Sequence, residues 1–266
     1  MLELKFIKEA LNFFGRVSSL GWHENNAGNL SYRLNKDEAT KAAVFFNQKT
    51  FVPFSKGFTA DTEGFFLVTA SGCKIGEIDA APTESLLIIE ISSDKKGYFI
   101  VWGGVGSKPT SELSSHLGAL GKQGEPCRKV AYHSHPEHLI ALSFILPPSP
   151  AAFTRALWFS GTECALTFPE GIGAMGERVP GSDLLAQDTL AALSRFKLVV
   201  WAHHGVFSVG ESFSHAFSLV DTAEKYAGIY LKILSAGFKE PPCPISRDTL
   251  ITACESFGLK IDKELL

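Results

Sequence analysis

Two histidines one residue apart, joined by a third far along the chain, constrain this sequence more than any other feature. His133 and His135 lie in the strand-like segment Val130–His135, and side chains two residues apart on a strand point to the same face. Two such imidazoles can bind one ion, and His204, which precedes Gly205, would add a third nitrogen from another strand end. Three nitrogen ligands with one open position are typical of catalytic zinc.

The pattern leaves two questions open. A strand can carry two histidines without any function, so the pair alone does not establish a metal site. His203 and His204 are also neighbours that would point to opposite faces of a strand, so only one of them can join the pair, and the spacing favours neither. The other histidines show no partner pattern and are interpreted as structural or exposed: His23, His116, His138 and His215.

Composition excludes several classes of protein. The 266 residues are 45% hydrophobic and 20% charged, which is typical of a soluble globular protein, and the net charge of −3 with no basic run gives no indication of nucleic acid or a membrane surface as partner. No apolar run approaches the roughly 20 residues of a membrane helix, and the charged N-terminus is unlike a secretory signal. Five widely spaced cysteines without a CxxC pair predict neither disulfides nor a thiolate zinc site, so we expect a cytoplasmic protein.

Hydrophobic periodicity predicts helices and strands that alternate along the chain. Helices are predicted at residues 7–17, 136–146, 151–160, 182–196, 214–236 and 246–257, with one more that starts at Thr110 or Ser111 as its cap. Strands are predicted at residues 30–34, 65–69, 86–91, 98–102, 130–135, 165–168 and 198–201. Residues 36–60 show no clear period and are expected to form a long excursion. We expect one α/β domain over residues 1–266, with a sheet of about seven to nine strands.

Three short segments have the composition of anion-binding loops, because each combines amide or hydroxyl donors with a glycine or a helix start. They are residues 25–29 with Asn26 and Asn29, residues 69–72 with Ser71 and Gly72, and residues 109–112 with Thr110 and Ser111. Each is equally compatible with an ordinary turn or cap, since asparagine, serine and glycine are the usual turn residues.

Several carboxylates are candidates for acid–base chemistry. Glu112 lies in the first turn of a predicted helix, where it would either compensate the helix dipole or act as a general base beside a metal. Glu163 precedes a predicted strand and is either a solvated loop residue or a second acid or base. Asp221 and Glu224 resemble paired catalytic carboxylates, but Lys225 follows them, which favours a solvated, ion-paired helix surface.

In these residues and their contexts the chain resembles the class II aldolase/adducin superfamily over most of its length. The matching stretches include Asn26-x-Gly28-Asn29-Leu30, Val68-Thr69-x-Ser71-Gly72, Pro109–Leu113, His133-x-His135, His204–Phe207 and Asp221–Lys225. The His-x-His and His-Gly pieces are shared by the whole superfamily, whereas residues 109–113 and 153–163 are closer to its rhamnulose-phosphate branch. Ala27 and Ala70 depart from the pattern, because small glycine-type residues are usual there.

The resemblance implies a role for each candidate residue. His133, His135 and His204 become the ligands of one Zn²⁺ per subunit, which favours His204 over His203. Glu112 becomes the catalytic carboxylate, and Glu163 is a second candidate for catalysis. The phosphate site of a sugar-phosphate substrate becomes Asn26, Asn29, Ser71, Gly72, Thr110 and Ser111.

The resemblance also implies a fold and an assembly. The expected fold is a single three-layer α/β/α domain with a largely antiparallel central sheet, and the expected assembly is a homotetramer. The expected reaction is aldol cleavage beside a ketone, which needs an electron sink such as a divalent metal and a group that carries the proton.

Three alternatives stay open at this point. The first is another sugar-phosphate enzyme of the superfamily, namely a fuculose-phosphate aldolase, a pentulose-phosphate 4-epimerase or a methylthioribulose-phosphate dehydratase. The second is an adducin-like scaffold without catalysis, which has no need of three histidines and Glu112. The third is a zinc hydrolase, although the sequence has no His-Glu-x-x-His helix to support it.

Overall fold

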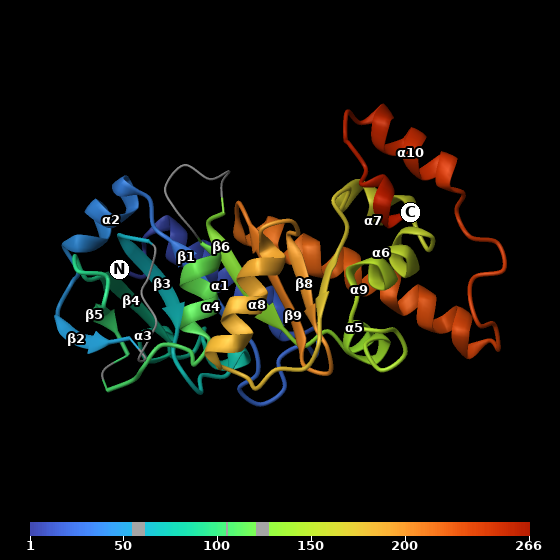
Figure 1. Cartoon of the computed structure of the whole chain (residues 1–266). Coiled ribbons are helices and arrows are strands. Elements are labelled where there is room, and N and C mark those ends of the chain that lie inside the picture. Colours follow the sequence, from blue (N-terminus) through green and yellow to red (C-terminus); the bar gives the residue numbers. More distant parts are fainter. Residues whose placement is uncertain (55–61, 105, 121–127) are drawn as a thin grey trace. The chain divides into compact units, whose positions relative to one another are not determined.

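The computed structural model describes residues 1–54, 62–104, 106–120 and 128–266, which form an α/β protein (Figure 1). Its strands are β1 Asn29–Arg33, β2 Thr50–Pro53, β3 Phe65–Thr69, β4 Leu86–Ile91, β5 Gly97–Gly103, β6 Val130–Ser134, β7 Gly173–Met175, β8 Leu198–Trp201 and β9 Gly205–Gly210. Its helices are α1 Lys5–Ser18, α2 Lys36–Ala43, α3 Pro82–Ser85, α4 Leu113–Ala119, α5 Glu137–Leu142, α6 Pro150–Trp158, α7 Thr162–Thr167, α8 Asp183–Leu193, α9 Phe213–Ser235 and α10 Arg247–Ser256. Two 3₁₀ turns, η1 Ile75–Glu77 and η2 Lys263–Leu265, complete the regular structure of these residues.

The strands follow the order β2-β5-β4-β3-β1-β6-β9-β8-β7 in a mixed sheet. Pairing is antiparallel from β2 through to β6 and between β8 and β9, whereas β7 and β8 run parallel. The expectation of a largely antiparallel sheet is therefore confirmed. In the described residues the sheet has nine strands, the upper end of the predicted range.

The chain divides into two compact units. Unit 1 comprises residues 1–134, 179–187 and 209–216, and unit 2 comprises residues 135–178, 188–208 and 217–266. The single domain expected for residues 1–266 stays a prediction. None of the helices in the described parts of the chain is both long and apolar enough to cross a lipid bilayer.

Unit 1 places helices on both faces of its strands. On one face, Tyr132 of β6 meets Phe13 of α1 edge-on, with ring centroids 4.9 Å apart, and Tyr32 of β1 stacks against Phe6 at 6.0 Å. The opposite face, which carries Asn29 and its β6 partner, lies against α4. This layering follows from the alternation of side chains along β1 and β6, and it points the polar residues of both strands toward α4.

Unit 2 has its own core. Helix α6 packs beside β7, α7 packs beside α6, and α10 packs beside α7. The indole of Trp158 is fully buried and donates through Nε1 to the Phe168 carbonyl at 3.1 Å. Trp201 of β8 stacks on Phe207 of β9 with ring centroids 5.3 Å apart. The stacked pair Trp201 and Phe207 lies at the turn between β8 and β9 that carries His204.

Two stretches differ from the predicted elements. The excursion expected at residues 36–60 contains α2 and β2, although residues 55–60 lie outside the described part of the chain. Helix α2 starts with a capping box, in which Asn35 accepts from the Glu38 backbone and Glu38 accepts from the Asn35 backbone. The strand predicted at residues 165–168 is wrong, because Thr162–Thr167 forms helix α7 with Cys164 and Ala165 buried. A short apolar run does not distinguish a strand from a buried helix.

The predicted cap at Thr110 or Ser111 is also wrong. Helix α4 begins at Leu113, so Glu112 occupies the N-cap position. Thr110 lies two residues before the N-cap, and its hydroxyl accepts from the Glu112 backbone N–H at 3.3 Å. The two residues before the helix therefore form a turn that presents the Glu112 side chain at the start of α4.

Candidate active site

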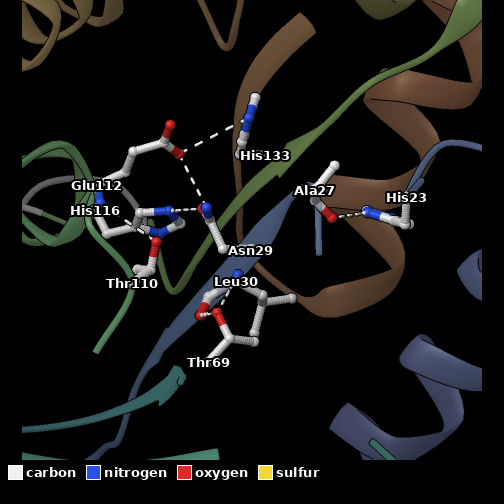
Figure 2. A network of polar contacts seen from close by, with 9 residues as sticks. All are labelled: His23, Ala27, Asn29, Leu30, Thr69, Thr110, Glu112, His116 and His133. Carbon is white, nitrogen blue, oxygen red and sulfur yellow. Dashed lines mark hydrogen bonds and ion pairs between the residues drawn. The ribbon is translucent and has the colours of Figure 1, made fainter. Parts of the chain in front are cut away.

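The three predicted anion-binding loops lie side by side in unit 1. Thr69, at the end of β3, accepts from the Leu30 backbone N–H through Oγ1 at 3.1 Å and from the Thr110 backbone N–H through its carbonyl at 3.0 Å (Figure 2). Ala70 and Pro109 form an isolated β-bridge beside these bonds. Hydrogen bonds of the backbone thus bring together three loops that are far apart in the sequence.

Gly28 allows the first loop to approach β6 closely. Its φ is +77°, a left-handed conformation that L residues with a side chain adopt rarely. A Cβ at this position would lie 2.8 Å from the His133 carbonyl oxygen and 2.3 Å from Nδ1 of His23. The glycine therefore lets Asn29 pair directly opposite His133 in the β1–β6 register.

Glu112 is buried at the centre of a polar network, with 5% of its surface exposed. Nδ2 of Asn29 donates to its Oε2 at 2.9 Å, and the same oxygen lies 3.8 Å from Nε2 of His133 (Figure 2). Oδ1 of Asn29 is bonded to Nε2 of His116, whose side chain is fully buried. Because the amide of Asn29 donates toward Glu112, its oxygen faces His116, and Nε2 of His116 carries the proton of that bond.

The environment of this network brings the pKa of the Glu112 carboxyl close to neutral pH. Burial raises the pKa of Glu112 from 4.5 to about 7, and the hydrogen bond from Asn29 opposes the rise. Burial also lowers the pKa of His116 to about 3, so this histidine is neutral at physiological pH. A bound cation would lower the pKa of Glu112 in turn. A carboxyl of this kind can accept and return a proton near neutral pH.

The three predicted metal ligands form a group in the structure. Ring nitrogens of His133, His135 and His204 lie within 4.8 Å of one another. The rings of His135 and His204 meet edge-on with centroids 5.1 Å apart. Three imidazoles, one of them 3.8 Å from the Glu112 carboxylate, form a donor set that suits a divalent ion such as zinc.

The neighbouring histidine is engaged elsewhere. Nδ1 of His203 is bonded to Oε1 of Glu177 at 3.0 Å, and its Nε2 is bonded to the Ser143 carbonyl at 3.1 Å. Its ring also stacks on Phe144 at 4.2 Å. The sequence spacing favours neither His203 nor His204 as the third member of the group. The geometry distinguishes them, since only His204 joins His133 and His135.

Comparison with known proteins places the chain in a family. Residues 8–231 match the class II aldolase and adducin N-terminal domain. This chain belongs to the class II aldolase and adducin family. Curated relatives called rhamnulose-1-phosphate aldolase include one from Pectobacterium carotovorum, 38% identical over 90% of this chain and 88% of its own, and one from Listeria monocytogenes, 35% identical over 98% and 96%. As predicted, the chain is a lyase.

Solved structures agree with the family assignment. A sugar-phosphate aldolase from Thermotoga maritima matches with a TM-score of 0.74 at 28% identity, over 88% of this chain and 97% of that one. An L-fuculose-1-phosphate aldolase from Thermus thermophilus matches with a TM-score of 0.59 at 19% identity, over 88% and 98% of the two chains, and shows the shared fold. The expected class II aldolase fold is therefore confirmed.

The second carboxylate predicted to act in this aldolase has a different setting. Glu163 lies in the first turn of α7, where it is exposed and accepts from the Tyr226 hydroxyl at 2.8 Å and from Thr162 at 3.1 Å. The Tyr226 hydrogen bond is the main cause that lowers the pKa of Glu163. Its contacts are those of an ionised surface carboxylate, and its catalytic role stays a prediction.

The residues predicted to bind phosphate differ in exposure. Thr110 is buried, whereas Asn26, Ser71, Gly72 and Ser111 are exposed to solvent and are accessible to a ligand. Asn29 is half-buried, with its amide directed at Glu112 and His116. Its contacts suit a residue that orients the Glu112 carboxyl.

Two residues of the aldolase were missed or misread from the sequence. His116, interpreted as structural or exposed, is bonded to Asn29 beside Glu112. Its spacing of four from Glu112 places both residues on one side of a helical turn, and this spacing is the sequence signal that could have identified it. Glu224, interpreted as solvated, is buried and bonded to the start of α5.

Proposed function

We propose that the protein is a zinc-dependent aldolase that reversibly cleaves L-rhamnulose 1-phosphate to dihydroxyacetone phosphate and L-lactaldehyde in L-rhamnose catabolism. The observation that carries the proposal is the buried Glu112 carboxyl beside His133, a member of the three-histidine group, in a family of aldolases. The substrate is suggested by relatives called rhamnulose-1-phosphate aldolase at 35–38% identity over most of the chain.

The proposed chemistry divides the work between a metal and a carboxyl. Zn²⁺ held by His133, His135 and His204 would supply the positive charge that stabilises the negative charge developing beside the ketone. Glu112 would carry the proton to and from the carbon at which the bond breaks, and its pKa of about 7 suits that exchange at neutral pH. Asn29 would hold the carboxyl in place, because it donates to Oε2 at 2.9 Å.

The phosphate would bind at the three adjoining loops through neutral donors. Ser71 and Ser111 are exposed, and among the residues that the structure describes the backbone N–H groups of Gly72 and Ser111 have no acceptor within the chain. Asn26 adds a side-chain amide, and Thr110 and Asn29 complete the proposed set. None of the three loops contains an arginine. Phosphate bound in this way would position the reacting carbon by interactions remote from it.

The assembly and the location of the enzyme are further parts of this proposal. We expect a homotetramer, which sedimentation of the purified protein would test. We also expect the enzyme in the cytoplasm, because the described cysteines Cys73, Cys164, Cys243 and Cys254 are all free thiols, as is usual in a reducing compartment.

A substrate panel tests the proposed function. Purified protein is incubated with rhamnulose 1-phosphate, fuculose 1-phosphate and unphosphorylated rhamnulose, and the release of dihydroxyacetone phosphate or dihydroxyacetone is followed by a coupled assay. We expect efficient cleavage of rhamnulose 1-phosphate alone. Equal efficiency with and without the phosphate would refute the phosphate site, and a preference for fuculose 1-phosphate would replace the proposed substrate.

Glu112→Gln tests the proposed catalytic carboxyl. The amide keeps the shape of the side chain but cannot carry a proton, so turnover should fall by about 10²–10⁴-fold while zinc content stays the same. The exposed Glu84 offers a matched control, because Glu84→Gln makes the same chemical change away from the site. Normal exchange of the dihydroxyacetone phosphate C3 proton with solvent in Glu112→Gln would contradict the assigned role.

A further inference from the structure

Helix α5 begins immediately after a proposed metal ligand and lacks a cap of its own. His135 is followed by Pro136, which occupies the N-cap position of α5 in an extended conformation. Proline has no side-chain acceptor, although the first backbone N–H groups of every helix need partners. The N–H groups of His138 and Leu139, at the second and third positions of the helix, must therefore be satisfied from elsewhere.

Glu224 of α9 provides the missing acceptor from a distance of 86 residues in the sequence. Its Oε1 accepts from the His138 backbone at 2.9 Å and is bonded to Nδ1 of the His138 ring at 2.8 Å, and its Oε2 accepts from the Leu139 backbone at 2.9 Å. The carboxylate is 7% exposed, and the His138 ring lies so close to Gly228 that a Cβ there would stand 3.1 Å from it. A buried carboxylate with three hydrogen bonds is fixed in position and fixes its partners.

The other end of α5 contacts the segment that carries the second ligand of this unit. Ser143 is the C-cap of α5, and its hydroxyl accepts from the His203 backbone N–H at 2.8 Å. The Ser143 carbonyl is bonded to Nε2 of the His203 ring at 3.1 Å. His203 has a φ of +61°, a conformation that is unfavourable for a residue with a side chain, and His204 follows it directly. Helix α5 thus connects the chain beside His135 to the chain beside His204.

We propose that Glu224 is a positioning residue that sets the metal affinity of the site by anchoring α5, and through α5 the ligands His135 and His204. This inference rests on the metal site of the proposed function. Glu224 itself does not have to touch the ion. Side chains that orient metal ligands typically change metal affinity by about 10–100-fold when they are altered.

Zinc affinity of the folded, metal-free protein tests the proposal. Apo-protein is titrated with Zn²⁺ in competition with a chromophoric chelator, and folding is checked by circular dichroism. Glu224→Gln should bind zinc about 10–100-fold more weakly. The substitution replaces one of the two accepting oxygens with an NH₂ group, which cannot accept from the backbone N–H that it faces. Asp221→Asn is the matched control, since Asp221 is exposed on the same helix and loses the same charge. We expect it to bind zinc as the wild type does.

A second variant separates positioning from general stability. Pro136→Ser places a hydroxyl at the N-cap position, where it can accept from the same two N–H groups as Glu224. In the Glu224→Gln background this change should restore zinc affinity. If Glu224→Gln does not fold, the double variant decides: a folded double variant with wild-type affinity supports the proposal, and an unfolded or weakly binding one overturns it.

The outcomes also distinguish this inference from the function beneath it. A wild-type protein that binds no divalent ion would remove the metal site and the proposed function together. A wild-type protein that binds zinc tightly, beside a folded Glu224→Gln variant that binds it equally well, would overturn the role of Glu224 alone.

Discussion

The buried carboxyl of Glu112 should make the metal-free protein less stable as the pH rises. Its folded pKa, about 7, lies above its usual value of 4.5, so the folded state holds the proton more tightly than the unfolded state. The stabilisation that this carboxyl contributes is therefore fully present below pH 4.5. It is lost as the pH rises from 4.5 through the folded pKa of about 7. At about 1.4 kcal/mol per pH unit, the loss is about 1 kcal/mol at pH 5 and about 3 kcal/mol at pH 8.

Urea unfolding of apo-protein at the two pH values measures this loss. Glu112→Gln has no proton to release, so it should exceed the wild type in stability by about 3 kcal/mol at pH 8 and by about 1 kcal/mol at pH 5. With an m value of about 3 kcal/mol/M, the difference at pH 8 corresponds to a midpoint about 1 M higher in urea. The variant that abolishes proton transfer should thus be the more stable protein.

A control variant and one refuting result complete this test of the Glu112 titration. Glu84→Gln changes an exposed glutamate in the same way and should leave the unfolding free energy within about 0.5 kcal/mol of the wild type at both pH values. If wild type and Glu112→Gln show the same pH dependence between pH 5 and pH 8, the carboxyl does not titrate in this range, and the reasoning from burial is refuted.

Two further predictions concern the metal and the phosphate. His204→Ala should lose stoichiometric zinc whereas His203→Ala should retain it, as measured by elemental analysis after dialysis; the opposite pattern would exchange the two assignments. Gly72→Val should raise the Michaelis constant for the phosphorylated sugar more than Ser71→Ala does, because φ at Gly72 is +77° and a branched side chain strains that loop. Equal constants in the two variants, measured with zinc retained, would argue against close backbone approach to the phosphate.

Elements with a long or clean hydrophobic period were predictable from the sequence. The helix at residues 7–17 and the strand at residues 65–69 show one apolar face or an unbroken apolar run, and both are present. Helix α2 was missed because it buries only Ala42, so its apolar period is too weak to see. Helix α7 was misread because its six residues are too few to display a period.

The candidate site was predictable only where its residues are close in sequence. The pair His133 and His135 follows from the alternation of a strand, and the structure adds His204 to it. The bond between Asn29 and Glu112 joins residues 83 apart, and it depends on strand register and loop packing that no local pattern contains. Glu224 was misread for the same reason, since its partners lie on another helix.

The polar network around Glu112 also has a consequence for the order in which the protein can be made. Asn29 and His116 are 87 residues apart, so at a synthesis rate of about 5–20 residues per second Asn29 waits at least about 4 s for its partner. Strand β1 pairs with both β3 and β6, which emerge later. A chain that ends before β6 therefore leaves one edge of β1 unpaired, and an open strand edge favours aggregation.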